Sequence, residues 1–146
     1  MTDNPETPIR GGCLCGEVAF EVTPPAKFCI HCHCTMCRRA NGAAFVTWVV
    51  MPEARVRMVA GEAALVRYQS SPGGSRSFCG KCGTQLFCQN DHHPGLIDVT
   101  RASLPDDAGF EPRSHIYYSD KAAWVEVTDG LRKLGGETGT EPLEDD

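Results

Sequence analysis

The chain has 146 residues, a formal net charge of −5 and 41% hydrophobic residues. This length fits one domain with a buried core. The acidic balance excludes a broad basic surface of the kind that binds nucleic acid or anionic membranes. We therefore expect neither nucleic acid nor a membrane among its partners.

The two ends of the chain differ in composition from its middle. Residues 1–10 are polar, contain two prolines and lack an apolar stretch, so we expect a flexible lead with no signal peptide. Residues 135–146 are polar and acidic, and we expect a disordered tail. A single domain is then predicted over 11–134. No run of residues is long and apolar enough for a transmembrane helix, so the sequence predicts a cytoplasmic, reducing location.

Short β-strand signals fill the middle of the chain. The clearest lies at residues 17–22, where Val18, Phe20 and Val22 share one face at a period of two. Further strands are expected at 44–50, 55–60, 64–69, 84–89, 96–100, 113–118 and 124–128. One short helix is expected after Cys34. The density of short strands predicts a mainly β, antiparallel domain with little helix.

Seven of the nine cysteines fall in three tight clusters. They are Cys13-Leu-Cys15, Cys32-His-Cys34-Thr-Met-Cys37 and Cys79-Gly-Lys-Cys82. Such short spacings are typical of thiolates that bind one ion, with zinc as the default. A disulfide framework is the alternative, but the odd cysteine count and the expected reducing location argue against it.

The first and third clusters both end in Cys-Gly. A glycine after the last cysteine permits a positive φ and lets backbone amides approach the sulfur. We therefore assign Cys13, Cys15, Cys79 and Cys82 to one structural zinc. The alternative is a redox Cys-x-x-Cys of the thioredoxin type, which normally precedes a helix in a βαβ unit; no such unit is predicted.

The second cluster supplies three sulfurs and is followed by Arg38 and Arg39 instead of glycine. Three protein ligands leave one zinc position for water or substrate, as in catalytic sites. The two arginines are candidate contacts for substrate carboxylates. The alternative is a second structural site that is closed by Cys29, His31 or His33.

The remaining candidates have simpler interpretations. His115 is predicted to be a hydrogen-bonded core histidine, and His92 and His93 to be exposed loop histidines. Trp48 and Trp124 are predicted to be core aromatics. Cys88 is predicted to be a small buried hydrophobe in a strand.

The ordered clusters resemble the glutathione-dependent formaldehyde-activating enzyme family, which also includes centromere protein V. The likeness extends from about residue 11 to residue 130. It rests on the stretches Gly11-Gly12-Cys13-Leu-Cys15-Gly16-Glu-Val18, Cys32-His33-Cys34-Thr-Met-Cys37-Arg38-Arg39, Phe78-Cys79-Gly-Lys-Cys82-Gly83-Thr84 and His115-Ile116, followed by Trp124. Cys29 departs from the family pattern.

The resemblance implies a β-tent fold, in which two antiparallel sheets are held by a structural zinc at Cys13, Cys15, Cys79 and Cys82. It also implies a catalytic zinc at Cys32, Cys34 and Cys37, and so two Zn²⁺ ions per chain. The reaction that it implies joins the glutathione thiol to formaldehyde, giving S-(hydroxymethyl)glutathione, and is of the carbon–sulfur lyase type.

Two other functions remain open from the sequence. One is a non-catalytic zinc-binding module with a protein partner. The other is a thiol or zinc redox sensor that uses the three-cysteine site.

Overall fold

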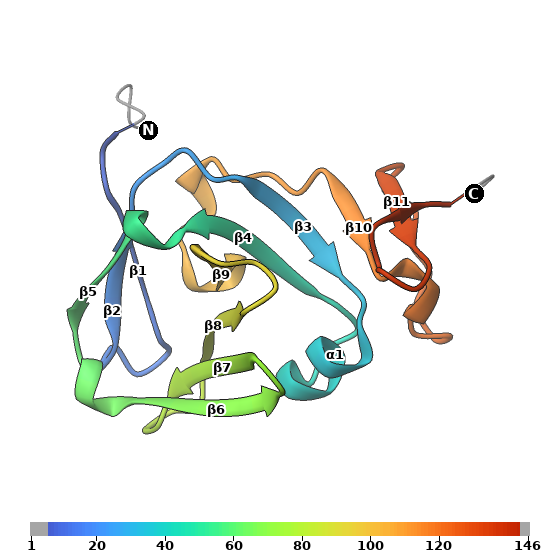
Figure 1. Cartoon of the computed structure of the whole chain (residues 1–146). Coiled ribbons are helices and arrows are strands. Elements are labelled where there is room, and N and C mark those ends of the chain that lie inside the picture. Colours follow the sequence, from blue (N-terminus) through green and yellow to red (C-terminus); the bar gives the residue numbers. More distant parts are fainter. Residues whose placement is uncertain (1–5, 144–146) are drawn as a thin grey trace. The chain divides into compact units, whose positions relative to one another are not determined.

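The computed structural model describes residues 6–143, which are mainly β with one α-helix in that range (Figure 1). The predicted β-rich chain with little helix is confirmed. The described backbone divides into two compact units, residues 6–27 with 49–110 and residues 28–48 with 111–143. Within residues 6–143, no helix combines the length and the apolar composition needed to cross a membrane.

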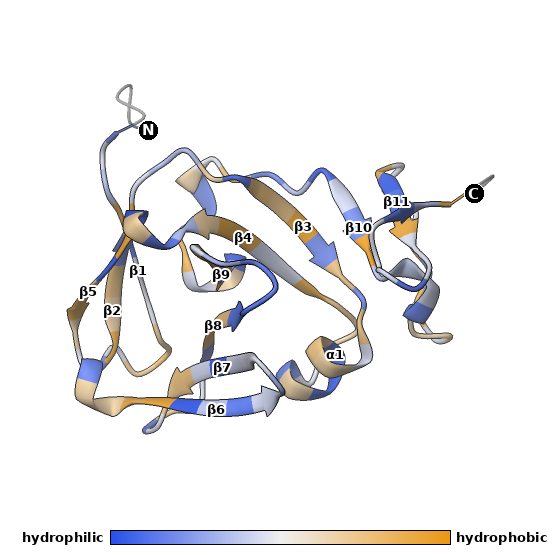
Figure 2. Ribbon diagram, in the orientation of Figure 1, coloured by the Kyte–Doolittle hydropathy of each residue, from blue (hydrophilic) through white to orange (hydrophobic). Residues whose placement is uncertain are grey.

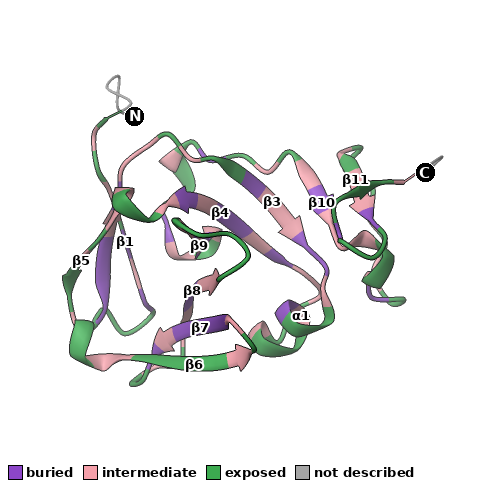
Figure 3. Cartoon of the chain, in the orientation of Figure 1, coloured by how far each residue is buried: buried purple, intermediate pink, exposed green. Residues whose placement is uncertain are grey.

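In the first unit, a small antiparallel sheet has the order β1-β2-β5. Its strands are β1 (Ile9–Gly12), β2 (Ala19–Val22) and β5 (Val56–Ala60). The predicted alternation is confirmed, because Val18, Phe20 and Val22 are all fully buried. Figures 2 and 3 show β2 as an apolar and largely buried strand. The Phe20 ring packs edge-on against Phe87, with 5.0 Å between the ring centroids.

Four further strands of the first unit pair antiparallel in the order β9-β8-β7-β6. They are β6 (Leu65–Ser71), β7 (Gly74–Cys79), β8 (Gln85–Asn90) and β9 (Leu96–Thr100). Strand β4 (Val46–Pro52) begins in the second unit and enters the first at Val49. Short 3₁₀ turns lie at Glu53–Arg55, Glu62–Ala64, Arg101–Ser103 and Asp106–Ala108.

The second unit contains β3 (Phe28–Cys32), α1 (Thr35–Asn41), β10 (Ser114–Ile116), the 3₁₀ turn Tyr118–Asp120, β11 (Arg132–Gly135) and β12 (Glu141–Pro142). Strand β10 pairs parallel with both β3 and β11, which corrects the expectation of antiparallel pairing alone. Parallel neighbours need a long connection. Residues 33–113 provide it between β3 and β10.

The helix after Cys34 is confirmed as α1, but the strand predicted at 124–128 is wrong. There the Lys121 ammonium donates to the carbonyls of Ala122 and Val125, which holds this segment in a turn. Strand β7 was missed, because Ser75, Arg76 and Ser77 are buried without an apolar alternation.

The two terminal segments are only partly described. Strand β1 begins within the predicted N-terminal lead of 1–10, whose residues 1–5 lie outside the described residues. Strand β12 lies within the predicted C-terminal tail of 135–146, whose residues 144–146 also lie outside them.

Candidate metal centres

Four cysteine sulfurs of the first unit converge on one point. The Sγ atoms of Cys13, Cys15, Cys79 and Cys82 all lie within 4.8 Å of one another. Cys13 and Cys15 are 3.6 Å apart at sulfur, and Cys15 and Cys79 are 3.9 Å apart. A tetrahedron with zinc–sulfur bonds of about 2.3 Å has sulfurs about 3.8 Å apart. The donor set and its spacing therefore fit one zinc ion, and all four cysteines are free thiols.

The turn after each cysteine pair explains this convergence. Gly16 and Gly83 have φ angles of 83° and 81°, which confirms the positive φ expected of the Cys-Gly endings. A Cβ at either glycine would meet nothing within 4 Å, so the backbone conformation alone favours glycine there. The turns also place backbone N–H groups within hydrogen-bonding distance of the cysteine sulfurs. Val18 N–H donates to Cys13 Sγ at 3.2 Å, and Lys81 N–H donates to Cys79 Sγ at 3.4 Å.

The Cys82 sulfur is prepared for the thiolate form. Thr84 Oγ1 lies 3.2 Å from Cys82 Sγ. Hydrogen bonds from the Thr84 side chain and backbone, then from the Cys15 backbone, lower the pKa of Cys82 to about 5. Metal-binding cysteines must be deprotonated, so these hydrogen bonds favour metal binding at neutral pH.

Three more sulfurs converge in the second unit. Cys32 ends β3, Cys34 is the N-cap of α1 and Cys37 lies in its first turn. Their Sγ atoms lie within 4.8 Å of one another. Cys37 N–H donates to Cys34 Sγ at 3.2 Å, so the helix cap itself positions this sulfur.

Among the described residues, no fourth histidine, cysteine or carboxylate ligand atom joins this three-sulfur group. Cys29, His31 and His33, the residues that could have closed the site, therefore do not complete it. Cys32 and Cys37 are buried, whereas Cys34 is half-buried. The donor set fits a zinc ion with one position left for an outside ligand.

The three sulfurs cannot all ionise without a cation. Hydrogen bonds to Cys34 and Cys37, burial, and the negative charges of those two neighbours all raise the pKa of Cys32. A divalent ion reverses this repulsion, because a coordinating thiol is deprotonated outright. The chemistry of the cluster thus favours an ion at its centre.

A pocket of about 330 Å³ lies along helix α1, the same helix that carries Cys37. Its lining residues are Thr35, Arg38, Arg39, Gly42, Ala43 and Trp124. Trp124 is 72% exposed, so its predicted core role is wrong; Trp48 is buried as predicted. The apolar face of an exposed tryptophan beside two arginines makes this pocket suited to a small anionic ligand.

The two arginines differ in their contacts. Arg38 Nη1 donates to the Asp120 carbonyl at 2.8 Å and so ties α1 to the turn after β10. Arg39 is exposed on the pocket wall. Helix α1 ends two residues later, at Asn41, and its C-cap Gly42 has a φ of 60°. Arg39 is the better placed of the two for a ligand carboxylate.

Comparisons with known proteins identify the family of the chain. The model of the glutathione-dependent formaldehyde-activating enzyme family matches residues 8–120. The chain belongs to this family. A protein of Halomonas elongata that is provisionally named a glutathione-dependent formaldehyde-activating enzyme is 28% identical over 127 residues, covering 82% of this chain and 80% of the relative.

A crystal structure of a Rhodobacter sphaeroides protein is also similar to this chain. It has a TM-score of 0.58 at 27% identity, and the match covers 72% of this chain and 93% of that chain. The stretch matched by the formaldehyde-activating family model contains all seven clustered cysteines, but it ends before Trp124 and Asp129.

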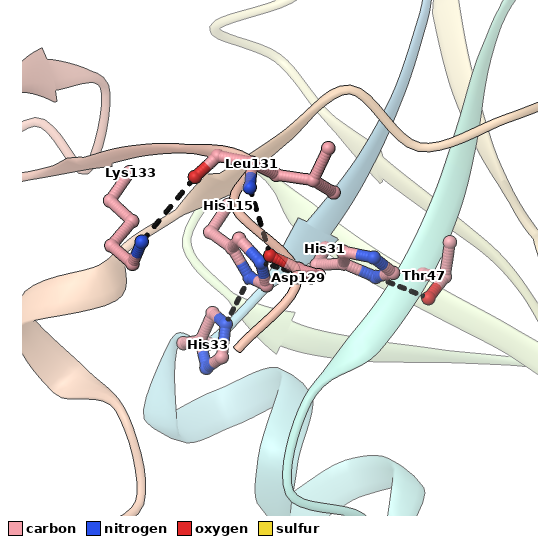
Figure 4. Close-up of polar contacts among 7 residues, drawn as sticks. All are labelled: His31, His33, Thr47, His115, Asp129, Leu131 and Lys133. Carbon is pink, nitrogen blue, oxygen red and sulfur yellow. Dashed lines mark hydrogen bonds and ion pairs between the residues drawn. The ribbon is translucent and has the colours of Figure 1, made fainter. Parts of the chain in front are cut away.

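This member of the formaldehyde-activating family also has a cluster of histidines in its second unit. His115 is fully buried and hydrogen-bonded, as predicted: its Nδ1 lies 2.8 Å from His33 Nε2, and its Nε2 lies 2.8 Å from Asp129 Oδ2 (Figure 4). Asp129 carries no distinguishing signal in the sequence, because a lone aspartate before a glycine is an ordinary turn signal. His92 and His93 lie exposed in the turn after β8, as predicted.

Tyr117 is a second residue of this region that no sequence pattern predicted. Among residues 6–143 it is the non-glycine residue with a positive φ, 53°. Burial, and then the negative charges of Cys32, Cys34 and Cys37, raise its pKa. A strained, half-buried tyrosine within electrostatic range of the three sulfurs belongs to the surroundings of that site. No local sequence signal identifies such a residue.

Proposed function

We propose that this chain joins a small thiol to a small aldehyde, acting as a carbon–sulfur lyase in the direction of addition. Glutathione and formaldehyde are the first pair to test, given the family. The observation that carries this proposal is the three-sulfur group of Cys32, Cys34 and Cys37, which no fourth described protein ligand completes.

The sulfurs suit a catalytic ion better than a structural one. The four-sulfur group of the first unit is saturated by protein, whereas the three-sulfur group has room for one outside donor. A zinc ion bound there would lower the pKa of a substrate thiol and supply thiolate at neutral pH. The protein's own part is to hold Cys34 in place through the cap of α1.

The pocket along α1 supplies the second element of the proposal. Arg39 would bind a carboxylate of the thiol substrate, and the Trp124 ring would cover its apolar portion. Arg38 would position the pocket wall without binding the substrate, because its guanidinium donates a hydrogen bond to the Asp120 carbonyl. This arrangement favours thiols that carry carboxylates, of which glutathione is one.

The proposed reaction balances without a further reactant. One carbon–sulfur bond forms, the carbonyl π bond becomes an O–H bond, and the thiol proton ends on the former carbonyl oxygen. No oxidant or reductant is needed. The same bond breaks in the reverse, lyase direction.

The test is exchange spectroscopy with ¹³C-labelled formaldehyde and glutathione. We expect the protein to accelerate interconversion of the free and thiol-bound forms above the rate in buffer. Cys34→Ser should reduce that acceleration more than ~100-fold and should remove one zinc equivalent. Cys88 lies in a strand, outside the four-sulfur and three-sulfur groups. Cys88→Ser should therefore retain both the rate acceleration and the zinc content.

Two results would contradict the proposal. One is a Cys34→Ser protein that keeps the full activity and the full zinc content of the wild type. The other is a wild-type protein that holds zinc at both cysteine sites and never exceeds the spontaneous rate with any carboxylate-bearing thiol.

A further inference from the structure

We propose that His31, His115 and Asp129 form a third metal site, which takes a divalent ion of the zinc class. This site lies in the second unit and contains no sulfur. It shares no donor atom with the four-sulfur or the three-sulfur group, and it does not depend on the proposed lyase activity.

The strand pairing brings the two histidines together. Strand β10 runs parallel to β3, and in their register His115 lies directly opposite His31. The two ring centroids are 4.8 Å apart. Asp129, from the segment before β11, reaches His115 with 2.8 Å between Oδ2 and Nε2. One ring nitrogen of each histidine and one carboxylate oxygen lie within 4.8 Å of one another.

Each of the three side chains is held through its other polar atom (Figure 4). His31 Nδ1 lies 2.7 Å from Thr47 Oγ1, and His115 Nδ1 lies 2.8 Å from His33 Nε2. Asp129 Oδ1 accepts from Leu131 N–H at 3.0 Å. Supporting contacts of this kind are the usual partners of metal ligands, because they fix the tautomer and the ring orientation.

With both Nδ1 atoms engaged, the second ring nitrogen of each histidine is the candidate ligand atom. His115 Nε2 forms a hydrogen bond with Asp129 Oδ2 at 2.8 Å, and an ion bound between these two atoms would replace that hydrogen bond. Two neutral imidazoles and one carboxylate are a donor set typical of zinc and of neighbouring first-row ions. The single negative charge of Asp129 offsets half the charge of a divalent ion.

Burial gives the site a closed side and an open side. His115 is fully buried, His31 is half-buried and the Asp129 side chain is 40% exposed. An ion could enter past Asp129 and keep water in its remaining positions. Open positions of this kind are typical of sites with three protein ligands.

A hydrogen-bonded chain without metal is the competing explanation. The contacts from Asp129 through His115 to His33 account for two of the three ligand residues on their own. They do not account for His31, which meets this group and is oriented by Thr47. The two explanations differ in whether the protein binds a metal equivalent that contains no thiolate.

The experiment measures zinc stoichiometry and cobalt spectra of the full chain. We expect zinc titration of the wild-type protein to saturate at three equivalents. Cobalt should then give thiolate charge-transfer bands for two equivalents and a third equivalent without them. Asp129→Asn and His31→Gln should each lose the third equivalent and retain the thiolate bands. His92→Gln, an exposed histidine of the first unit, is the matched control and should keep all three.

Thr47→Val separates a metal site from a hydrogen-bonded cluster. Loss of an outer partner lowers metal affinity by roughly 10-fold to 100-fold, so this variant should bind the third equivalent more weakly without abolishing it. The proposal is overturned if wild-type protein saturates at two equivalents under excess zinc. It is also overturned if Asp129→Asn and His31→Gln keep three equivalents at unchanged affinity.

Discussion

The sulfurs of Cys15 and Cys79 lie 3.9 Å apart although 64 positions separate the two residues in the chain. This contact joins the turn between β1 and β2 to the turn after β7, and therefore links the two sheets of the first unit. A metal at this point would close a long loop, which contributes to folding free energy because the unfolded chain has no preformed site.

Removing one of these sulfurs should therefore unfold more than a local turn. Cys79→Ser is expected to lose one zinc equivalent and to lower Tm by about 10 °C or more, because structural zinc contributes several kcal/mol to folding. Calorimetry and zinc analysis check this. Cys88→Ser, at a half-buried position of β8, is the control: it should keep its zinc content and lower Tm much less than Cys79→Ser. An unchanged Tm in Cys79→Ser would show that the four-sulfur group does not support the fold.

Arg39→Ala should weaken binding of carboxylate-bearing thiols. If the exposed guanidinium on the pocket wall contacts a substrate carboxylate, its loss should raise KM for glutathione about 10-fold with little change in kcat, since a charged hydrogen bond contributes roughly 1.5–3 kcal/mol. Steady-state kinetics measure this. A thiol without carboxylates, such as 2-mercaptoethanol, is the control substrate. An equal loss with both thiols would contradict the assigned role.

Gly139→Ala should destabilise the second unit strongly. Gly139 has a φ of 80°, and a Cβ there would overlap the Tyr117 ring. We expect a loss of about 2–4 kcal/mol, because overpacking is added to left-handed strain. Gly95→Ala is the matched control: its φ is 79° and nothing lies within 4 Å of the added Cβ, so about 1 kcal/mol is expected. Denaturant unfolding compares the two variants. Equal losses would mean that Tyr117 does not pack on Gly139.

Asp98 should make stability depend on pH. Burial raises the pKa of this carboxyl in β9 to about 6, against the opposing charge of Arg76. The folded state then holds the proton more tightly than the unfolded state, so this group adds stability as pH falls from above 6 to about 4. At pH 8 its buried charge costs about 3 kcal/mol, because a change of one pKa unit corresponds to about 1.4 kcal/mol.

Asp98→Asn should remove that pH dependence. The quantity to compare is the difference between wild type and variant in the free energy of unfolding, measured from pH 4.5 to pH 8. The wild-type curve alone is not enough, because burial and His115 lower the pKa of His33 to about 4, which acts in the opposite direction. A difference in the free energy of unfolding that stays constant across this range would contradict the raised pKa of Asp98.

Predictions from the sequence were confirmed where the conformation of a segment depends only on its own residues. The alternation of Val18, Phe20 and Val22 places all three in the core, because side chains of a strand alternate between its faces. The Cys-Gly endings predict the positive φ of Gly16 and Gly83. Trp124 shows the limit of such reasoning. Its exposure depends on the turn held by Lys121, which no pattern around the tryptophan indicates.

The sequence by itself determined the β-rich class, the family and the division of seven cysteines into sets of four and three. These follow from residue spacing, which local backbone geometry translates directly into ligand positions. Only the tertiary structure decided that Cys29 stays apart from the three sulfurs and that His31 meets His115 and Asp129. Those contacts depend on the parallel pairing of β3 with β10, two strands whose register is set by long-range packing.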